Sequence, residues 1–121
     1  MARVLVIEDR HNIRKFVSIN LSARGYLVEE AADGREGLEK LRRNRPDVLL
    51  LDIKMPRMSG LDVLKAMARD PQLRSIPVIV MTASSANLDD GHQYDNVEQI
   101  LVKPLSVPDL VSMVGEVLSK R

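Results

Sequence analysis

Val48-Leu49-Leu50-Leu51-Asp52 is an apolar run that ends in a single acid. A strand that is apolar at every position is typical of a parallel sheet with both faces covered, because both sets of its side chains are then buried. Pro46 stands two residues before the run and ends the helical pattern of the preceding segment. The stretch therefore predicts a central strand of an α/β sheet, with an acid at its carboxyl end.

Similar apolar runs lie on both sides of this strand, separated by amphipathic segments with helical spacing. Strands are expected at residues 4–7, 26–28, 78–81 and 100–102, and helices at 11–24, 34–44 and 61–68, with a last helix that has Asp109 near its start and Lys120-Arg121 at its end. A further helix is expected between residues 83 and 99, but it should be weak because that segment is rich in Asn, Asp and Gly. This alternation predicts a flavodoxin-like doubly wound five-stranded parallel sheet, order 2-1-3-4-5, with five helices, and residues 1–121 as one domain.

Composition restricts the classes of function. The net charge is +1 and there are no cysteines. Direct binding to nucleic acid, a disulfide framework and a thiolate metal site are therefore not expected. No apolar run approaches the roughly 20 residues that span a bilayer, so a cytoplasmic protein with no membrane partner is predicted. Arg42, Arg43 and Arg45 stand where a helix should end, and there they complement the helix dipole.

Polar residues follow four of the five predicted strands. Glu8 and Asp9 follow the first, Asp52 ends the third, Thr82 follows the fourth and Lys103 follows the fifth. Ligands of open α/β sheets bind beyond the carboxyl ends of the strands, so these side chains should share one cleft.

Three carboxylates in one cleft repel each other, by about 4 kcal/mol for a pair 4 Å apart at an effective dielectric near 20. Either one carboxyl holds a proton or a cation binds, and Mg²⁺ suits oxygen ligands and phosphate. A lysine and a metal facing one carboxylate, with a hydroxyl nearby, are suited to phosphoryl transfer. Asp52 is then the candidate nucleophile.

The segment Asp52-Ile53-Lys54-Met55-Pro56-Arg57-Met58-Ser59-Gly60 resembles the phosphoacceptor signature of response-regulator receiver domains in two-component signalling. The Glu8-Asp9, Thr82-Ala83 and Lys103-Pro104 pairs resemble the same family. All four motifs occur in order at strand ends, and the resemblance covers essentially the whole chain.

The resemblance implies a role for each of these residues. Asp52 would accept a phosphoryl group from a histidine kinase or phosphotransfer protein. Asp9, Asp52 and the main-chain carbonyl of Lys54 would ligate Mg²⁺, with Glu8 acting directly or through water. Thr82 and Lys103 would bind phosphoryl oxygens, and Pro104 would follow a cis peptide.

The resemblance also implies a phosphoprotein that signals through protein contacts and is not an enzyme in its own right. Its phosphotransfer and dephosphorylation would be self-catalysed. The partner surface would be the face made by the fourth helix, fifth strand and fifth helix. Because the chain ends just after its last helix, no output domain is expected.

Two positions depart from the family pattern. Ile100 stands where an aromatic switch residue is common, three positions before the lysine, so Tyr94 and the loop after Thr82 are the alternative route for a signal. Asn96-Val97 replaces Gly-Ala, and Asn96 is expected to adopt a left-handed conformation there.

Other functions remain as alternatives. A receiver-like interaction domain that does not use phosphorylation would explain Ile100 and the weak fourth helix. A haloacid-dehalogenase-like phosphatase would need a second acid where Lys54 stands. A flavin binder would need a hydroxyl- and Gly-rich loop where Glu8-Asp9 stands.

Overall fold

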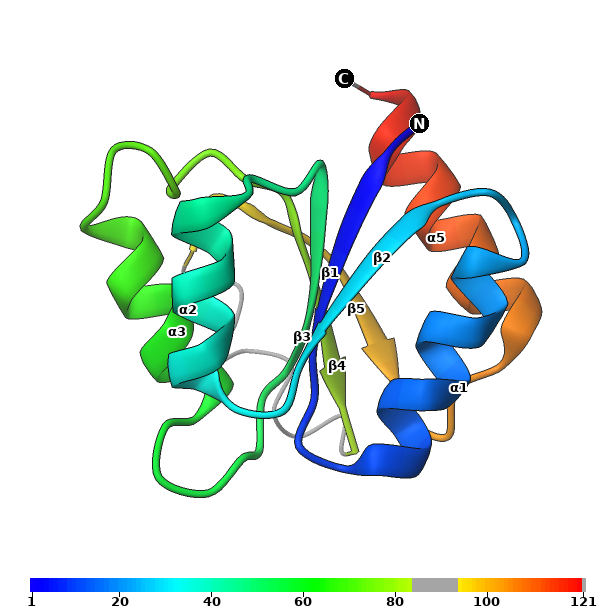
Figure 1. Cartoon of the computed structure of the whole chain (residues 1–121), viewed down its shortest axis with the longest axis horizontal. Helices are drawn as coiled ribbons and strands as arrows, with labels where there is room; N and C mark the ends of the chain where they lie inside the picture. The colour runs from blue at the N-terminus through cyan, green and yellow to red at the C-terminus, as the bar shows by residue number, and fades with distance from the viewer. Residues whose placement is uncertain (84–93, 121) are drawn as a thin grey trace.

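The computed structural model describes residues 1–83 and 94–120, which form a five-stranded sheet between two layers of helices (Figure 1). The strands are β1 (Arg3–Ile7), β2 (Leu27–Ala31), β3 (Val48–Asp52), β4 (Val78–Thr82) and β5 (Val97–Val102). Every neighbouring pair is parallel and the order is β2-β1-β3-β4-β5. The predicted sheet and strand order are therefore confirmed.

The helices are α1 (His11–Ser22), α2 (Gly34–Arg43), α3 (Gly60–Ala68) and α5 (Val107–Ser119). Helices α2 and α3 cover one face of the sheet, and α1 and α5 cover the other (Figure 1). The predicted fourth helix falls mainly on residues 84–93, which lie outside the described residues.

The alternation of side chains along β1 explains the two layers. Leu5 and Ile7 belong to the core on the α2 and α3 side, whereas Val4 and Val6 belong to the core on the α1 and α5 side. Successive side chains of a strand point to opposite faces, so a strand between two helical layers is apolar throughout. All five residues of β3 are buried, as the uninterrupted run 48–52 requires.

Several boundaries differ from the predicted ones. Strand β2 extends to Ala31, beyond the predicted end at Val28, because Glu29 and Glu30 lie on an edge strand where polar side chains are only partly buried. Strand β5 begins at Val97, three residues earlier than predicted. Helix α1 ends at Ser22, and Gly25 adopts a φ of 92°, as expected for a residue that closes a helix.

The expected left-handed conformation of Asn96 is wrong. Arg57, with a φ of 67°, is the one non-glycine residue with a positive φ in the described part of the chain. Asn96 instead forms hydrogen bonds across the chain: its Nδ2 donates to the Ile76 carbonyl at 3.1 Å, and its own carbonyl accepts from the Val78 amide at 2.8 Å. These two bonds replace the turn that the family pattern suggested.

The basic cluster at the end of α2 is engaged with the neighbouring loop. Arg42 lies 3.7 Å from Asp70, and Arg45 donates to the Gln72 carbonyl and the Ser75 hydroxyl. These contacts favour a structural role for the cluster. Among the described residues, no helix is both long and apolar enough to cross a bilayer.

Candidate functional site

Three acids meet where β1 and β3 end. The two strands are neighbours, with Ile7 paired to Leu51, so Glu8 and Asp52 follow side by side at the same edge. Carboxylate oxygens of Glu8, Asp9 and Asp52 all lie within 4.8 Å of one another. Glu8 and Asp52 are buried and Asp9 is half-buried, so water screens their mutual repulsion only weakly.

Lys103 lies between the two buried acids. Its Nζ is 2.8 Å from Glu8 Oε1 and 3.1 Å from Asp52 Oδ1, and 12% of its side chain is exposed. Its own amide donates to the Thr82 carbonyl at 2.7 Å, which continues the pairing of β4 with β5. The Lys103–Pro104 peptide is cis, as predicted.

The pKa of Asp52 is raised from its ordinary value of 3.8 to about 7. Burial is the largest cause, because it disfavours the charged form, and the negative charge of Glu8 acts in the same direction. Lys103 lowers this pKa but offsets only part of the rise. Without a cation, Asp52 therefore holds a proton for much of the time near neutral pH.

The donor set fits a hard divalent cation. The cluster contributes three carboxylates against the single ammonium of Lys103, and carboxylate oxygens are the ligands that Mg²⁺ prefers. The Oδ1 atom of Asp9 is buried and has no hydrogen-bond partner in the described part of the chain. A buried carboxylate oxygen without a partner is costly, and a cation would satisfy it.

Helix capping does not account for the acidic pair. Helix α1 begins after Arg10, and no side chain among the described residues caps it at that position. Glu8 Oε2 accepts from the Arg10 amide at 3.1 Å, so Glu8 rather than Asp9 stabilises the turn into α1. Asp9 remains directed to the cluster.

A family model for the response regulator receiver domain matches residues 4–115. The chain belongs to this family. Receiver domains bind Mg²⁺ at an acidic pocket, and Glu8, Asp9 and Asp52 form such a pocket in this one.

Curated relatives agree with this assignment. The chain is 34% identical over 116 residues to the polar-differentiation response regulator DivK of Brucella anthropi, with 95% of this chain and 94% of DivK covered. It is 33% identical over 121 residues to the DNA-binding dual master transcriptional regulator RpaA of Synechocystis, with 99% of this chain and 50% of RpaA covered. The chain thus spans about half the length of RpaA, and 54% of the length of the ArlR response regulators of Staphylococcus.

Solved structures show the same fold. The chemotaxis protein CheY4 of Vibrio cholerae is 37% identical with a TM-score of 0.90, over 98% of this chain and 99% of that one. TrrA of Thermotoga maritima, solved in complex with Mg²⁺ and BeF, is 30% identical with a TM-score of 0.87, over 98% of this chain and 100% of that one.

The remaining candidate residues occupy different positions around the site. Thr82 is buried at the end of β4. Lys54 lies two residues beyond β3 with an exposed side chain. Ile100 is partly buried and packs against the core on the α2 and α3 side. Tyr94 packs against the same core but precedes β5, with its carbonyl accepting from the Val97 amide, so it lies at the edge opposite Lys103.

Two contacts with the backbone of the acidic segment were not predicted, one made by Arg14 and one by Gly60 of the phosphoacceptor signature. Arg14 donates to the main-chain carbonyl of Glu8 at 2.9 Å. Gly60 lies so close to β3 that a Cβ there would be 2.3 Å from the Asp52 carbonyl oxygen. Both contacts are made to the backbone, which sequence patterns of side chains do not reveal.

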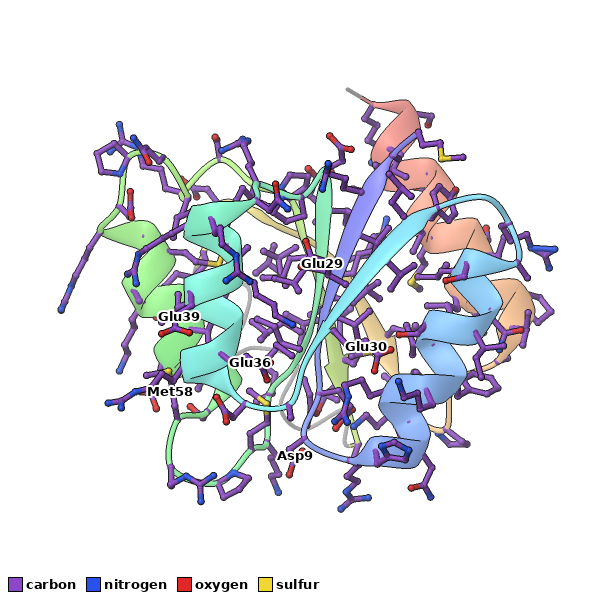
Figure 2. All side chains as sticks on the ribbon, viewed as in Figure 1. Asp9, Glu29, Glu30, Glu36, Glu39 and Met58 are labelled. Atoms are coloured by element: carbon purple, nitrogen blue, oxygen red, sulfur yellow. The ribbon has the colours of Figure 1, made fainter. Side chains whose placement is uncertain are left out.

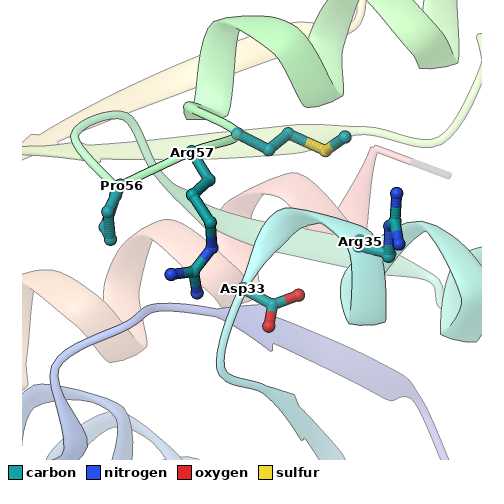
Figure 3. Close-up of a pocket in the computed structure, with 5 residues that line it drawn as sticks. Asp33, Arg35, Pro56 and Arg57 are labelled. Atoms are coloured by element: carbon teal, nitrogen blue, oxygen red, sulfur yellow. The ribbon is translucent and has the colours of Figure 1, made fainter.

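A hollow of about 380 Å³ lies on the same edge of the sheet, between the loops that follow β2 and β3 (Figure 3). It is lined by Asp33, Arg35, Pro56, Arg57 and Met58. Figure 3 shows the Arg57 side chain extending toward the loop that carries Asp33.

Arg57→Asn is expected to raise the free energy of unfolding by about 0.5 kcal/mol, because Asn adopts a positive φ at a lower cost than Arg does. Urea denaturation of both proteins measures the difference. A lower stability of the variant would instead show that contacts of the Arg57 side chain outweigh its backbone strain.

Proposed function

We propose that this receiver domain takes a phosphoryl group onto Asp52 from a histidine kinase or phosphotransfer protein, with Mg²⁺ as cofactor, and signals through protein contacts. The observation that carries the proposal is the placement of Lys103 between Glu8 and Asp52, beside a third carboxylate, that of Asp9, whose Oδ1 has no partner among residues 1–83 and 94–120. This arrangement can stabilise the negative charge that builds up on a phosphoryl group during its transfer.

In the proposed reaction, a carboxylate oxygen of Asp52 attacks the phosphorus atom, the bond from phosphorus to the donor nitrogen breaks, and an acyl phosphate forms on Asp52. The carboxylate must be ionised to attack, whereas its pKa without a cation is about 7. Mg²⁺ would be held by Asp9, Asp52 and the main-chain carbonyl of Lys54, and by Glu8 either directly or through water. Its charge there would favour the ionised form of Asp52 and offset the charge of the phosphoryl group.

Lys103 and Thr82 would bind the phosphoryl oxygens. Lys103 Nζ already contacts Asp52 Oδ1, so an ammonium donor is in place beside the atom that would carry the phosphoryl group. Thr82 ends the strand next to β3, and its hydroxyl is the proposed donor to a second oxygen. Later hydrolysis by water would return Asp52 to its carboxylate. Both the transfer of the phosphoryl group to Asp52 and its loss to water are proposed to be self-catalysed.

Incubation with acetyl phosphate and Mg²⁺, followed by intact mass measurement, tests this function. The wild-type protein is expected to gain about 80 Da, the mass of one phosphoryl group. Asp52→Asn is expected to gain nothing, whereas Asp109→Asn, the same replacement at an exposed acid on α5, should gain as much as the wild type. A wild-type protein that gains no mass, or an equal gain in Asp52→Asn, would contradict the proposal.

The replacement of an aromatic switch residue by Ile100 favours one alternative, a receiver-like domain that binds partners without phosphorylation. Ile100 packs into the core, where an isoleucine has no aromatic rotamer change to offer. The same mass experiment separates the two functions, because the alternative predicts no phosphoryl gain.

The proposed output surface includes β5 and α5, where Val102 is 42% exposed. The fourth helix, which would complete this surface, lies outside the described residues. The kinase, the output target and a location in the cytoplasm all stay predictions.

A further inference from the structure

Arg14 on α1 uses all three of its guanidinium nitrogens in contacts with different parts of the chain. Its Nη1 donates to the Glu8 carbonyl at 2.9 Å, its Nε lies 3.0 Å from Glu30 Oε1, and its Nη2 is 3.3 Å from His11 Nδ1. The side chain is 14% exposed, so these contacts are largely shielded from water. A planar guanidinium holds several acceptors in fixed directions, which an ammonium does not.

We propose that Arg14 is a positioning residue for the cation site, which acts by fixing the peptide that joins Glu8 to Asp9. The carbonyl that Arg14 binds belongs to this peptide. The proposal rests on the proposed function, because it assigns a role toward the cation that the three acids would hold.

Other contacts around this peptide explain why its orientation matters for Asp9. Glu8 is held at its amide by the Ala31 carbonyl, at 3.1 Å, and at its carboxylate by Lys103. Asp9 has no comparable anchor on Oδ1, which is buried without a partner among the described residues. The direction of the Asp9 carboxylate therefore depends on the backbone that carries it, and Arg14 fixes the carbonyl of that backbone.

Glu30 on β2 holds the other side of the guanidinium. Figure 2 shows Glu30 on the side of β2 that faces α1, and Asp9 at the edge where the strands end. Glu30 Oε2 also accepts from Lys15 at 3.0 Å. Burial by itself would raise the pKa of Glu30, but Lys15, Ser18 and Arg14 together hold it below its ordinary value. Glu30 is therefore ionised at neutral pH and keeps Arg14 directed at β1.

The competing explanation is that Arg14 contributes only its positive charge, which stands near the acids, or only general stability. Lys15 provides the matched comparison because it carries the same charge and binds the same glutamate, whereas within the described part of the chain the Glu8 carbonyl accepts from Arg14 and not from Lys15. Arg14→Lys keeps the charge and loses the fixed geometry. If geometry matters, Arg14→Lys and Arg14→Met should both weaken the cation site, and Lys15→Met should not.

Calorimetric titration with MgCl₂ tests the proposal, with thermal unfolding of each metal-free variant as a measure of stability. Arg14→Met is expected to weaken Mg²⁺ binding about tenfold, as is typical for residues that orient metal ligands. Arg14→Lys should weaken it by a factor of a few, and Lys15→Met by less than twofold. The change in the amide chemical shift of Asp9 on addition of MgCl₂ should be smaller in the Arg14 variants than in the wild type at the same cation concentration.

Equal effects of Arg14→Met and Lys15→Met would overturn the proposal in favour of charge alone, and unchanged Mg²⁺ binding in Arg14→Met would overturn it outright. If Arg14→Met does not fold, Arg14→Lys provides the test, because a wild-type affinity for Mg²⁺ in Arg14→Lys would contradict a geometric role. A wild-type protein that binds no Mg²⁺ would refute the proposed function itself. A wild-type protein that binds Mg²⁺ and is indifferent to Arg14 would refute this inference alone.

Discussion

Without Mg²⁺, the free energy of unfolding is expected to fall by about 2 kcal/mol as the pH rises from 5 to 8, because of Asp52. The pKa of its buried carboxyl is about 7 in the folded protein, against an ordinary value of 3.8. Between these two values the unfolded chain has already released the proton that the folded protein still holds. Stability therefore decreases with pH through this window and levels off above pH 7.

Urea denaturation in EDTA at several pH values measures this dependence, with Asp52→Asn as the control. The variant keeps every other ionisable side chain of the protein but has no carboxyl at position 52. Its stability should be nearly independent of pH, and at pH 8 it should exceed that of the wild type. Added Mg²⁺ should flatten the wild-type curve, because a bound cation favours the ionised carboxylate. Parallel pH curves for the two proteins would refute the raised pKa.

The strand ends explain why so much of the site was predictable from sequence. Asp52 and Lys103 each follow an apolar run, and the carboxyl ends of parallel strands share an edge. Once the alternation of strands and helices predicts a parallel sheet, the convergence of these side chains follows. The structure adds the distances and the burial, which raise the pKa of Asp52.

Features that depend on packing between distant segments were predicted less well. Phe16 has the spacing of an inward residue of α1, yet it is 37% exposed and lines a hollow beside Lys103 and Pro104. The bonds of Asn96 join it to Ile76 and Val78, far away in sequence. Periodicity within one segment does not report such partners, and local propensity gives way to them.

Gly60→Ala is expected to lower the free energy of unfolding by about 3 kcal/mol or more, which is a large fraction of the stability of a domain of this size. A Cβ at this position would lie 2.3 Å from the Asp52 carbonyl oxygen and 2.8 Å from Ile53 Cα. Both atoms are backbone and belong to the end of β3, so no side-chain rotation relieves the clash. The start of α3 must move away, and the hydrogen bond from the Gly60 amide to the Ile53 carbonyl, at 2.8 Å, must lengthen.

Gly115→Ala on α5 is the matched control, because a Cβ there would have no atom within 4 Å from the described residues beyond its own stretch of helix. The free energy of unfolding of that variant should be about 0.5 to 1 kcal/mol higher than that of the wild type, as expected for alanine in place of glycine within a helix. Urea denaturation compares the stabilities of the two variants. Folded Gly60→Ala should also take up a phosphoryl group from acetyl phosphate at least tenfold more slowly than the wild type, because Asp52 belongs to the displaced backbone. A Gly60→Ala protein as stable as wild type would show that α3 shifts without cost, and the close approach of α3 to β3 would then play no part in holding the proposed phosphoacceptor.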